Sequence, residues 1–465
     1  MEGGRWGISI AFGGLLICAG CPAPTAPPPA KLPLEGVTLK LLVVADPAIA
    51  KAVSQLRGEW KAVSGGELEV LEQPLADAIT ADVVIFPSRL LGELVEHGHL
   101  LPIPQATLES NELAWTEVFD LLKSREATWG QETYALPLGS PVFTLMYRAD
   151  LLKKLGKEAP NTWPEYLELA ETLKSQEGIA TVEPLAPGWS GKVLLARAAS
   201  YAKHPDNYST LFHKDSMEPL IAGPPFVRAL AELVAASKFS SAARSQDPKT
   251  ARQEVLAGRA AMALTWATAA DSLDDKQELP PGAQIAFAEL PGSEQVYNIG
   301  NQNWEPQTSG KVRLVPLLSI AGRLASVTQA SEKSTDALRL ITWLSGPKWS
   351  SRVAAVSSAT TLYRNSQLKS PQDWVDANLD ANAAVEYGDT VQKALVRESS
   401  LSTPRIPGEV EYLQALDEAV TTAGEGAAKP EVALATAAAK WQEITNRFGL
   451  TKQRQAYHRS LGLEL

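Results

Sequence analysis

The stretch DVVIF, residues 82–86, decides the fold of this chain. Its four apolar residues leave neither face for water, which is typical of a strand buried inside a parallel sheet. An earlier run, VTLKLLVVA at residues 37–45, predicts another strand, and residues 49–63 carry apolar side chains at helical spacing. Residues 90–97 predict a helix that ends at Gly98. This alternation of strands and helices predicts a parallel α/β sheet.

Length and composition predict two lobes. The chain has 465 residues, of which 45% are hydrophobic, and this is enough for two sizeable cores. Its 43 Lys and Arg against 53 Asp and Glu give a formal net charge of −10, which repels nucleic acid and anionic lipid. No second long apolar run follows the N-terminus, so the sequence excludes a polytopic membrane protein. We expect a monomer that binds no nucleic acid.

The N-terminus carries a targeting pattern. Arg5 precedes an apolar stretch at residues 8–17, too short for a lasting membrane span, and Cys18-Ala19-Gly20-Cys21 follows. This resembles a bacterial lipobox, although Cys18 stands where Leu is usual. We expect residues 1–20 to be a lipoprotein signal peptide and Cys21 to carry the lipid; an ordinary secretory signal is the alternative. Residues 21–36, rich in Pro and Ala, are then an extended tether to the periplasmic side of a bacterial membrane.

Recognisable catalytic motifs are missing from the sequence. Its only two cysteines lie in the targeting segment, so the body has no disulfide, cysteine-based zinc site or cysteine nucleophile. There is no G-x-S-x-G, H-E-x-x-H or phosphate-binding glycine loop. Ser200 and Lys203 fit S-x-x-K without its companion motifs, and His97 and His99 fit a turn after a helix. We predict no enzyme, no metal and no cofactor, although a two-carboxylate glycosidase stays open because such pairs need no fixed spacing.

Five further motifs, taken in chain order, resemble one protein family. They are YALP at 134–137, LMYRADLL at 145–152, PNTWPE at 160–165, GRAAMALTW at 258–266 and RIP at 405–407. Together with DVVIF they are similar to the extracellular solute-binding proteins that serve ABC sugar importers, the group of maltose- and multiple-sugar-binding proteins. The resemblance covers roughly residues 37–449. Arg148 departs from the usual Asn, and the connection at 295–311 is longer than is typical.

The resemblance implies a type II periplasmic binding protein fold. In it, two α/β lobes, each a mainly parallel sheet flanked by helices, are joined by a hinge that the chain crosses more than once. We expect lobe one at residues 37–139 and 291–327, and lobe two at 140–290 and 328–465. The implied function is capture of a small polar ligand, such as a sugar or oligosaccharide, by hinge closure for the permease subunits of an ABC importer. A secreted carbohydrate-active enzyme and a receptor that feeds a signalling partner are the alternatives.

A sugar presents apolar C–H faces and a ring of hydroxyl groups, so its site needs aromatic planes and paired polar groups. Trp266 ends a strand where the family carries a stacking aromatic residue, and Trp189 follows a Pro-Gly turn. Trp304 lies in the long 295–311 loop and is either a lid residue or a cover for its own loop. Core packing is the alternative for each tryptophan.

Polar candidates follow the strands of lobe one, because open α/β sheets bind ligands at the carboxyl ends of their strands. Asp46 follows the first strand, and Ser88 and Arg89 follow DVVIF. Arg89 offers a planar fork for adjacent hydroxyl groups, with a solvated charge as the alternative. The remaining candidates are Ser140 and Phe143 at the first lobe crossing and Tyr412 after the RIP motif, for which hinge packing is the alternative.

Overall fold

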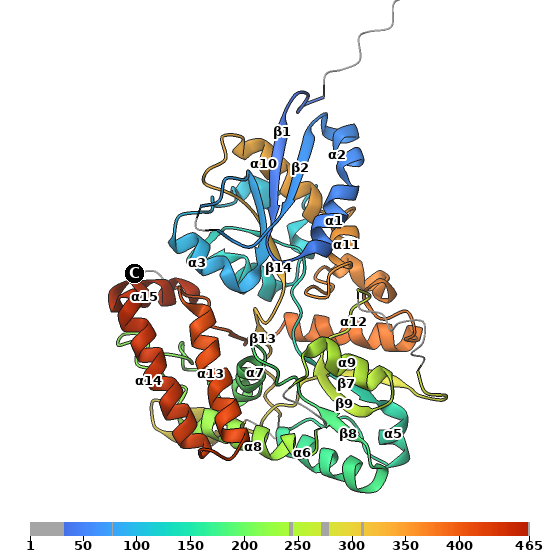
Figure 1. Cartoon of the computed structure of the whole chain (residues 1–465), viewed down its shortest axis with the longest axis vertical. Coiled ribbons are helices and arrows are strands. Elements are labelled where there is room, and N and C mark those ends of the chain that lie inside the picture. The colour runs from blue at the N-terminus through green and yellow to red at the C-terminus, as the bar shows by residue number, and fades with distance from the viewer. Residues whose placement is uncertain (1–31, 77, 241–244, 271–278, 308–310, 464–465) are drawn as a thin grey trace, which may run out of the picture.

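The computed structural model describes residues 32–76, 78–240, 245–270, 279–307 and 311–463. The predicted signal peptide, Cys21 and most of the predicted tether lie outside these residues. Two α/β lobes are present, one above the other in Figure 1, and the chain passes between them several times. The predicted two-lobe α/β architecture is therefore confirmed.

The first lobe is built on a five-stranded sheet in the order β2-β1-β3-β14-β6. β1 lies parallel to both β2 and β3. The DVVIF stretch runs into β3, in which Val83 to Phe86 are fully buried at 0% exposure, as predicted. The strands are β1 (Thr38–Val43), β2 (Glu67–Glu72), β3 (Val83–Pro87), β6 (Leu136–Pro137) and β14 (Arg323–Val327). Its early helices are α1 (Pro47–Gln55), α2 (Arg57–Ser64), α3 (Leu91–Glu96) and α4 (Gln105–Leu108).

The second lobe is built on a four-stranded sheet in the order β10-β7-β9-β8. The GRAAMALTW motif forms β9, in which every residue is buried. Thr162 caps the following helix as its sequence predicts: Thr162 Oγ1 accepts from the Glu165 amide, and Glu165 accepts from the Asn161 amide. The strands are β7 (Thr144–Arg148), β8 (Ala180–Val182), β9 (Ala260–Thr265) and β10 (Ile285–Glu289). The helices are α5 (Ala149–Lys154), α6 (Trp163–Thr172), α7 (Ser190–Ala202), α8 (Pro224–Ser237) and α9 (Pro248–Leu256).

Both sheets are mixed, which corrects the expectation of mainly parallel sheets. In the first lobe β14 is antiparallel to β3 and to β6. In the second lobe β7 is antiparallel to β9 and to β10, and only β8 pairs in parallel. β7 and β14 each follow a passage of the chain from the other lobe. β7 and β14 therefore enter their sheets from the hinge. A parallel direction would require a crossover connection, usually a helix packed on the same sheet.

Two segments lie in the lobe opposite to the one expected. A hairpin of β11 (Gln295–Asn298) and β12 (Asn303–Pro306) packs on α7 and α8 and so belongs to the second lobe. Helices α10 (Ser334–Ser345) and α11 (Ser350–Ala354) pack on β14, β6 and α1 and so belong to the first lobe. The buried face of α10 extends the apolar core under the first sheet. Amphipathic spacing shows that a helix has a buried face, but it does not show which sheet that face covers.

The C-terminal helices form a bundle in the second lobe, drawn in red in Figure 1. The last of them also reaches the first lobe, because Arg459 pairs with Glu96 at the end of α3. The bundle helices are α13 (Glu409–Gly424), α14 (Pro430–Phe448) and α15 (Leu450–Ser460), whereas α12 (Ala381–Leu395), drawn in orange, packs on β10 of the second sheet. The remaining short strands are β4 (Thr128–Trp129), β5 (Glu132–Thr133), β13 (Leu317–Leu318) and β15 (Leu401–Ser402). Within the described ranges, no helix is both long and apolar enough to cross a bilayer.

Candidate functional site

The chain segments that join the lobes meet at Ala321 and Gly322. Ser88, after β3, donates from its hydroxyl to the Ala321 carbonyl at 2.6 Å, and Ser140 donates to the same oxygen at 3.3 Å. Gly322 has a φ of +101°, and a Cβ there would lie 2.4 Å from the Ser140 hydroxyl oxygen. Only glycine fits this crossing without strain. Ser88 and Ser140 are both buried here, where they hold the hinge.

Asp46 also ties the first lobe to the hinge. Its carboxylate caps α1 by accepting from the Ile49 amide at 3.1 Å, and it accepts from the Ser357 hydroxyl at 2.6 Å. It also forms an ion pair of 2.9 Å with Arg323 at the start of β14. With three protein partners and 4% exposure, Asp46 has a structural task in this conformation.

Three of the predicted aromatic residues lie together on the second-lobe side. The ring centroids of Phe143, Trp189 and Trp266 are separated by 5.7 to 6.3 Å. Phe143 and Trp266 are buried, and the Trp266 indole N–H donates to the Ser358 carbonyl of the hinge at 2.9 Å. Trp189, just before α7, is partly exposed. We call these three rings the cleft cluster.

A pocket of about 680 Å³ lies beside the cleft cluster, lined by Gly188 and Lys192 on either side of Trp189. The first lobe contributes Arg89, and the second lobe contributes the start of α7 and one face of α13 from Glu409 to Thr422. Arg89 forms an ion pair with Glu409 at the start of α13, so a charged contact joins the two lobes at the pocket wall. The volume of the pocket falls within the range of small-molecule binding sites, roughly 300–1,000 Å³.

Asp417 on α13 positions the loop that carries Trp189. Its carboxylate accepts from the Gly188 amide at 2.8 Å, and from the Ser190 hydroxyl and the Gly191 amide at 2.7 Å each. A partly exposed aromatic ring on a loop fixed in this way can present its face to a ligand at little entropic cost. Asp417 also lines the pocket.

Lys192 is an unusual cation at this site, because α7 is buried along its whole length. Its ammonium group lies 4.2 Å from the Trp189 ring centroid and donates to the Ile320 carbonyl at 2.9 Å. Burial, followed by repulsion from Arg89, lowers the pKa of Lys192 to about 8, against a smaller opposing effect of Asp417. Lys192 therefore gives up its proton more readily than an ordinary lysine.

Lys192, Glu409 and Asp417 were missed by sequence reasoning. Lys192 lies three residues after Trp189, one helical turn into α7, and this spacing is the one signal that could have pointed to it. Glu409 and Asp417 read as surface positions of a helix, and only the packing of α13 against α7 brings them to the pocket.

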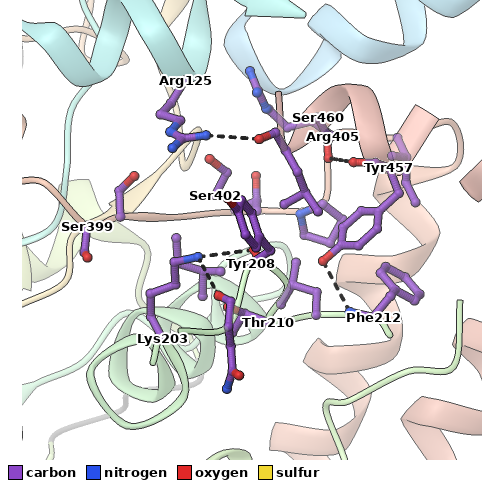
Figure 2. A pocket seen from close by; sticks show the side chains of 18 of the residues that line it. Arg125, Lys203, Tyr208, Thr210, Phe212, Ser399, Ser402, Arg405, Tyr457 and Ser460 are labelled. Atoms are coloured by element: carbon purple, nitrogen blue, oxygen red, sulfur yellow. Dashed lines mark hydrogen bonds between the residues drawn. The ribbon is translucent and has the colours of Figure 1, made fainter. Parts of the chain in front are cut away.

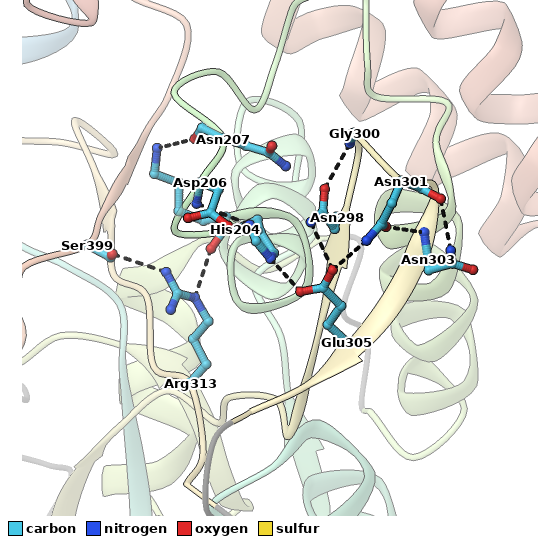
Figure 3. Close-up of polar contacts among 11 residues, drawn as sticks. His204, Asp206, Asn207, Asn298, Gly300, Asn301, Asn303, Glu305, Arg313 and Ser399 are labelled. Carbon is cyan, nitrogen blue, oxygen red and sulfur yellow. Dashed lines mark hydrogen bonds and ion pairs between the residues drawn. The ribbon is translucent and has the colours of Figure 1, made fainter.

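Trp304 lies away from the pocket. Its ring packs against Tyr201 and Tyr297 at centroid distances of 6.0 and 5.4 Å, on the hairpin that covers α7. Figure 3 shows how Glu305 fixes this hairpin: its carboxylate bonds to His204 at 2.9 Å and accepts from Asn298 and Asn301. Of the two interpretations of Trp304, the described part of the 295–311 loop fits a cover for its own loop, with Tyr201 of α7 packed beneath it.

Tyr412 also lies away from the pocket. It is fully buried in α13, its hydroxyl pairs with Thr445 at 2.9 Å, and its ring packs on Phe212 and Trp441. The prediction that Tyr412 contacts the ligand is wrong in this structure. The helix turns Tyr412 toward α14, and the next residue, Leu413, lines the pocket instead. Among the described residues no group of three potential metal ligands occurs. Cys21, the predicted lipidation site, lies outside the described residues.

Comparison with known proteins agrees with this geometry. The family model of bacterial extracellular solute-binding proteins matches residues 59–350. A solute-binding protein from Agrobacterium radiobacter in complex with ribitol is 18% identical, with a TM-score of 0.67 over 89% of this chain and 100% of that chain. The sugar-binding protein MalE from Xanthomonas citri is 18% identical, with a TM-score of 0.68 over 90% and 100% of the two chains. Maltose-bound MalE3 from T. maritima is 18% identical, with a TM-score of 0.64 over 88% and 100%. These likenesses confirm the predicted type II two-lobe fold.

Proposed function

Because this chain belongs to the bacterial extracellular solute-binding protein family, we propose that it captures a carbohydrate or polyol between its lobes for an ABC importer. The observation that carries the proposal is the pocket at the lobe boundary, where Arg89 of one lobe meets Glu409 and Lys192 of the other beside the cleft cluster. Aromatic faces next to charged hydrogen-bonding groups are what a polyhydroxylated ligand requires. Structural relatives bound to ribitol and maltose support this ligand class.

The lobes close on the ligand. A ligand that contacts Arg89 from one side and Trp189 and Lys192 from the other stabilises the closed arrangement through contacts that the open one lacks. The Arg89–Glu409 ion pair would be exchanged, wholly or in part, for contacts with ligand hydroxyl groups. The permease subunits of the importer then recognise the closed form, and the protein makes and breaks no bond.

The N-terminal segment anchors the protein outside the cytoplasm. Cleavage before Cys21 and lipidation of its thiol would place the body on the periplasmic side of a bacterial membrane, on the Pro/Ala-rich tether. Mass spectrometry of the protein from a bacterial membrane fraction would show an acylated N-terminal Cys21. An unmodified residue at the mature N-terminus would contradict the anchor.

A thermal-shift screen of monosaccharides, polyols and oligosaccharides tests the ligand class, because a ligand that prefers the native state raises the melting temperature by mass action. We expect at least one member to bind with a one-to-one calorimetric titration. Its recovery unaltered after incubation would exclude a carbohydrate-active enzyme. If only peptides, polyamines or metals shift the melting temperature, the carbohydrate assignment is wrong.

Trp189→Ala and Trp304→Ala form a matched pair that locates the site. Both replace a partly exposed tryptophan of the second lobe, but only Trp189 belongs to the cleft cluster. Loss of one stacking face should weaken binding of the carbohydrate about tenfold in Trp189→Ala. Trp304→Ala should retain the affinity of the unaltered protein, and equal losses in both variants would remove the pocket from the proposal.

A further inference from the structure

A second cavity, of about 350 Å³, lies apart from the carbohydrate pocket and shares none of its lining residues. Its walls come from the loop 203–212 that follows α7, the segment 398–406 and the end of α15, and the first lobe adds Arg125 (Figure 2). Like the carbohydrate pocket it is lined by both lobes, but the carbohydrate pocket is lined by the carboxylates of Glu409, Asp417 and Glu418, whereas Glu398 is the one carboxylate among the described residues that line this cavity. A different kind of ligand is therefore expected here.

The cavity gathers positive charge in a chain whose net charge is −10. Arg125 and Lys203 both line it. Arg313 lies just behind Lys203, since its guanidinium donates to the Lys203 carbonyl at 2.8 Å and to the Ser399 hydroxyl at 3.1 Å. Figure 3 labels Arg313 and Ser399 and marks the bond between them. One exposed carboxylate, Glu398, is also part of the wall.

Arg125 and Lys203 make only long hydrogen bonds to backbone carbonyls of the described protein. Arg125 donates to the Leu461 carbonyl at 3.3 Å, and Lys203 donates to the Asn207 and Tyr208 carbonyls at 3.4 Å each. The bonds of Arg125 and Lys203 are drawn as dashed lines in Figure 2. In the part of the chain that the structure describes, no carboxylate lies within 4.0 Å of either cation. Burial lowers the pKa of Lys203, and repulsion from the neighbouring cations Arg125 and Arg313 lowers it further.

Polar groups without a protein partner line the same cavity. The Thr210 hydroxyl and the Asn207 side-chain amide nitrogen are buried and make no hydrogen bond to the described protein atoms. Thr210 as a residue is 3% exposed. A buried hydrogen-bonding group left unpaired destabilises the folded protein, and a bound ligand that pairs with it would relieve that cost. Ser399 and Ser402 add further hydroxyl groups.

We propose that this cavity binds a small oxyanion such as phosphate, free or as the phosphate group of a small metabolite. The charges of Arg125 and Lys203 attract the oxyanion, and Thr210 and Asn207 supply hydrogen bonds. Because the chain as a whole is negatively charged, it repels anions elsewhere on its surface, so the oxyanion is bound by this cavity specifically. Arg125 belongs to the first lobe and Lys203 to the second, so the anion bridges the lobes at a place distinct from the carbohydrate pocket. The proposal does not depend on which solute that pocket takes.

Isothermal titration of the purified chain with inorganic phosphate, without carbohydrate and at constant ionic strength, tests the site. We expect one saturable binding event that sodium chloride does not produce. Arg125→Gln and Lys203→Met should each weaken it about tenfold, since each removes one charge-assisted contact. Arg352→Gln, which removes an exposed arginine paired with Glu59, should bind phosphate as the unaltered protein does.

Arg125 is exposed, so Arg125→Gln should leave the fold intact, and a loss of affinity in this variant reports on phosphate binding. Glycerol phosphate titrated in the same way separates the two sources of the anion: tighter binding than inorganic phosphate points to a phosphorylated metabolite, and equal or weaker binding to free phosphate. Absence of saturable heat with either compound, or unchanged affinity in both variants, would overturn the proposal.

Discussion

Two aromatic clusters of the second lobe look alike in sequence and differ in what surrounds them. The cleft cluster has one partly exposed ring, Trp189, with the Lys192 ammonium 4.2 Å from its centroid. The C-terminal cluster of Phe212, Tyr412, Trp441 and Tyr457 is buried throughout, with centroid distances of 4.9 to 5.5 Å. In the C-terminal cluster the polar groups of the rings are paired inside the protein. The Trp441 N–H donates to the Tyr412 carbonyl, and the Tyr457 hydroxyl pairs with the Ser209 hydroxyl.

We infer from this difference that an aromatic residue serves a ligand only where its face and its charged neighbours remain accessible. A buried ring whose polar group is paired inside the protein contributes to stability. We propose that Trp189, a partly exposed ring on a loop beside a cation, contributes instead to recognition. The comparison therefore predicts opposite effects of substitutions in the two clusters.

The largest expected effect is on stability, from Trp441→Ala in the C-terminal cluster. Removal of a fully buried tryptophan leaves a cavity and costs about 3–5 kcal/mol of unfolding free energy. Chemical denaturation measures this loss, and carbohydrate affinity of the folded fraction should be unchanged. A loss of binding larger than the loss of stability would show that the two clusters are not separate.

Lys192 should produce a pH dependence specific to the cleft cluster. Its folded-state pKa of about 8 lies below the ordinary value of 10.5, so below pH 8 the folded protein bears the cost of a buried charge. Between about pH 8 and 10.5 the folded state releases that proton while the unfolded state keeps it, and stability rises by about 3 kcal/mol in total.

Lys192→Met isolates this contribution. Denaturation of the two proteins between pH 7 and about 10.5 should show the unaltered protein gaining stability relative to Lys192→Met as pH rises. Parallel curves would mean that the ammonium group is not desolvated as the structure indicates.

The smallest effect is expected from Tyr412→Phe. It removes the hydrogen bond to Thr445 but keeps the ring in the C-terminal cluster, so unfolding free energy should fall by about 1 kcal/mol. Calorimetry should find carbohydrate affinity unaltered. A marked loss of affinity would restore Tyr412 to the binding site.

The sequence predicted those features of the fold that follow from local pattern. DVVIF and GRAAMALTW became buried strands, and the Thr162 cap formed with the expected hydrogen bonds. Lobe membership could not be predicted in the same way, because α10 and the 295–306 hairpin carry apolar faces that would fit either core. The mixed direction of the sheets likewise depends on where the chain crosses the hinge.

The candidate site was predictable only in part. The sequence pointed to Phe143, Trp189, Trp266 and Arg89, and the structure brings these residues to one region. Asp46 and Tyr412 carry suitable chemistry, yet an ion pair with Arg323 and packing beneath α14 occupy them instead. Such competition between internal partners and a ligand is a tertiary property that residue type and spacing do not reveal.

The most direct test of the account is the distance between the lobes with and without a carbohydrate found in the thermal-shift screen. In a Cys18→Ser, Cys21→Ser background the body has no other thiol, so spin labels can be placed by Val63→Cys in α2 and Lys174→Cys after α6. Both positions are exposed. We predict that saturating carbohydrate replaces a broad distribution of distances with a narrower, shifted one, because the ligand bridges the lobes. An unchanged distribution with bound carbohydrate would contradict closure on the ligand.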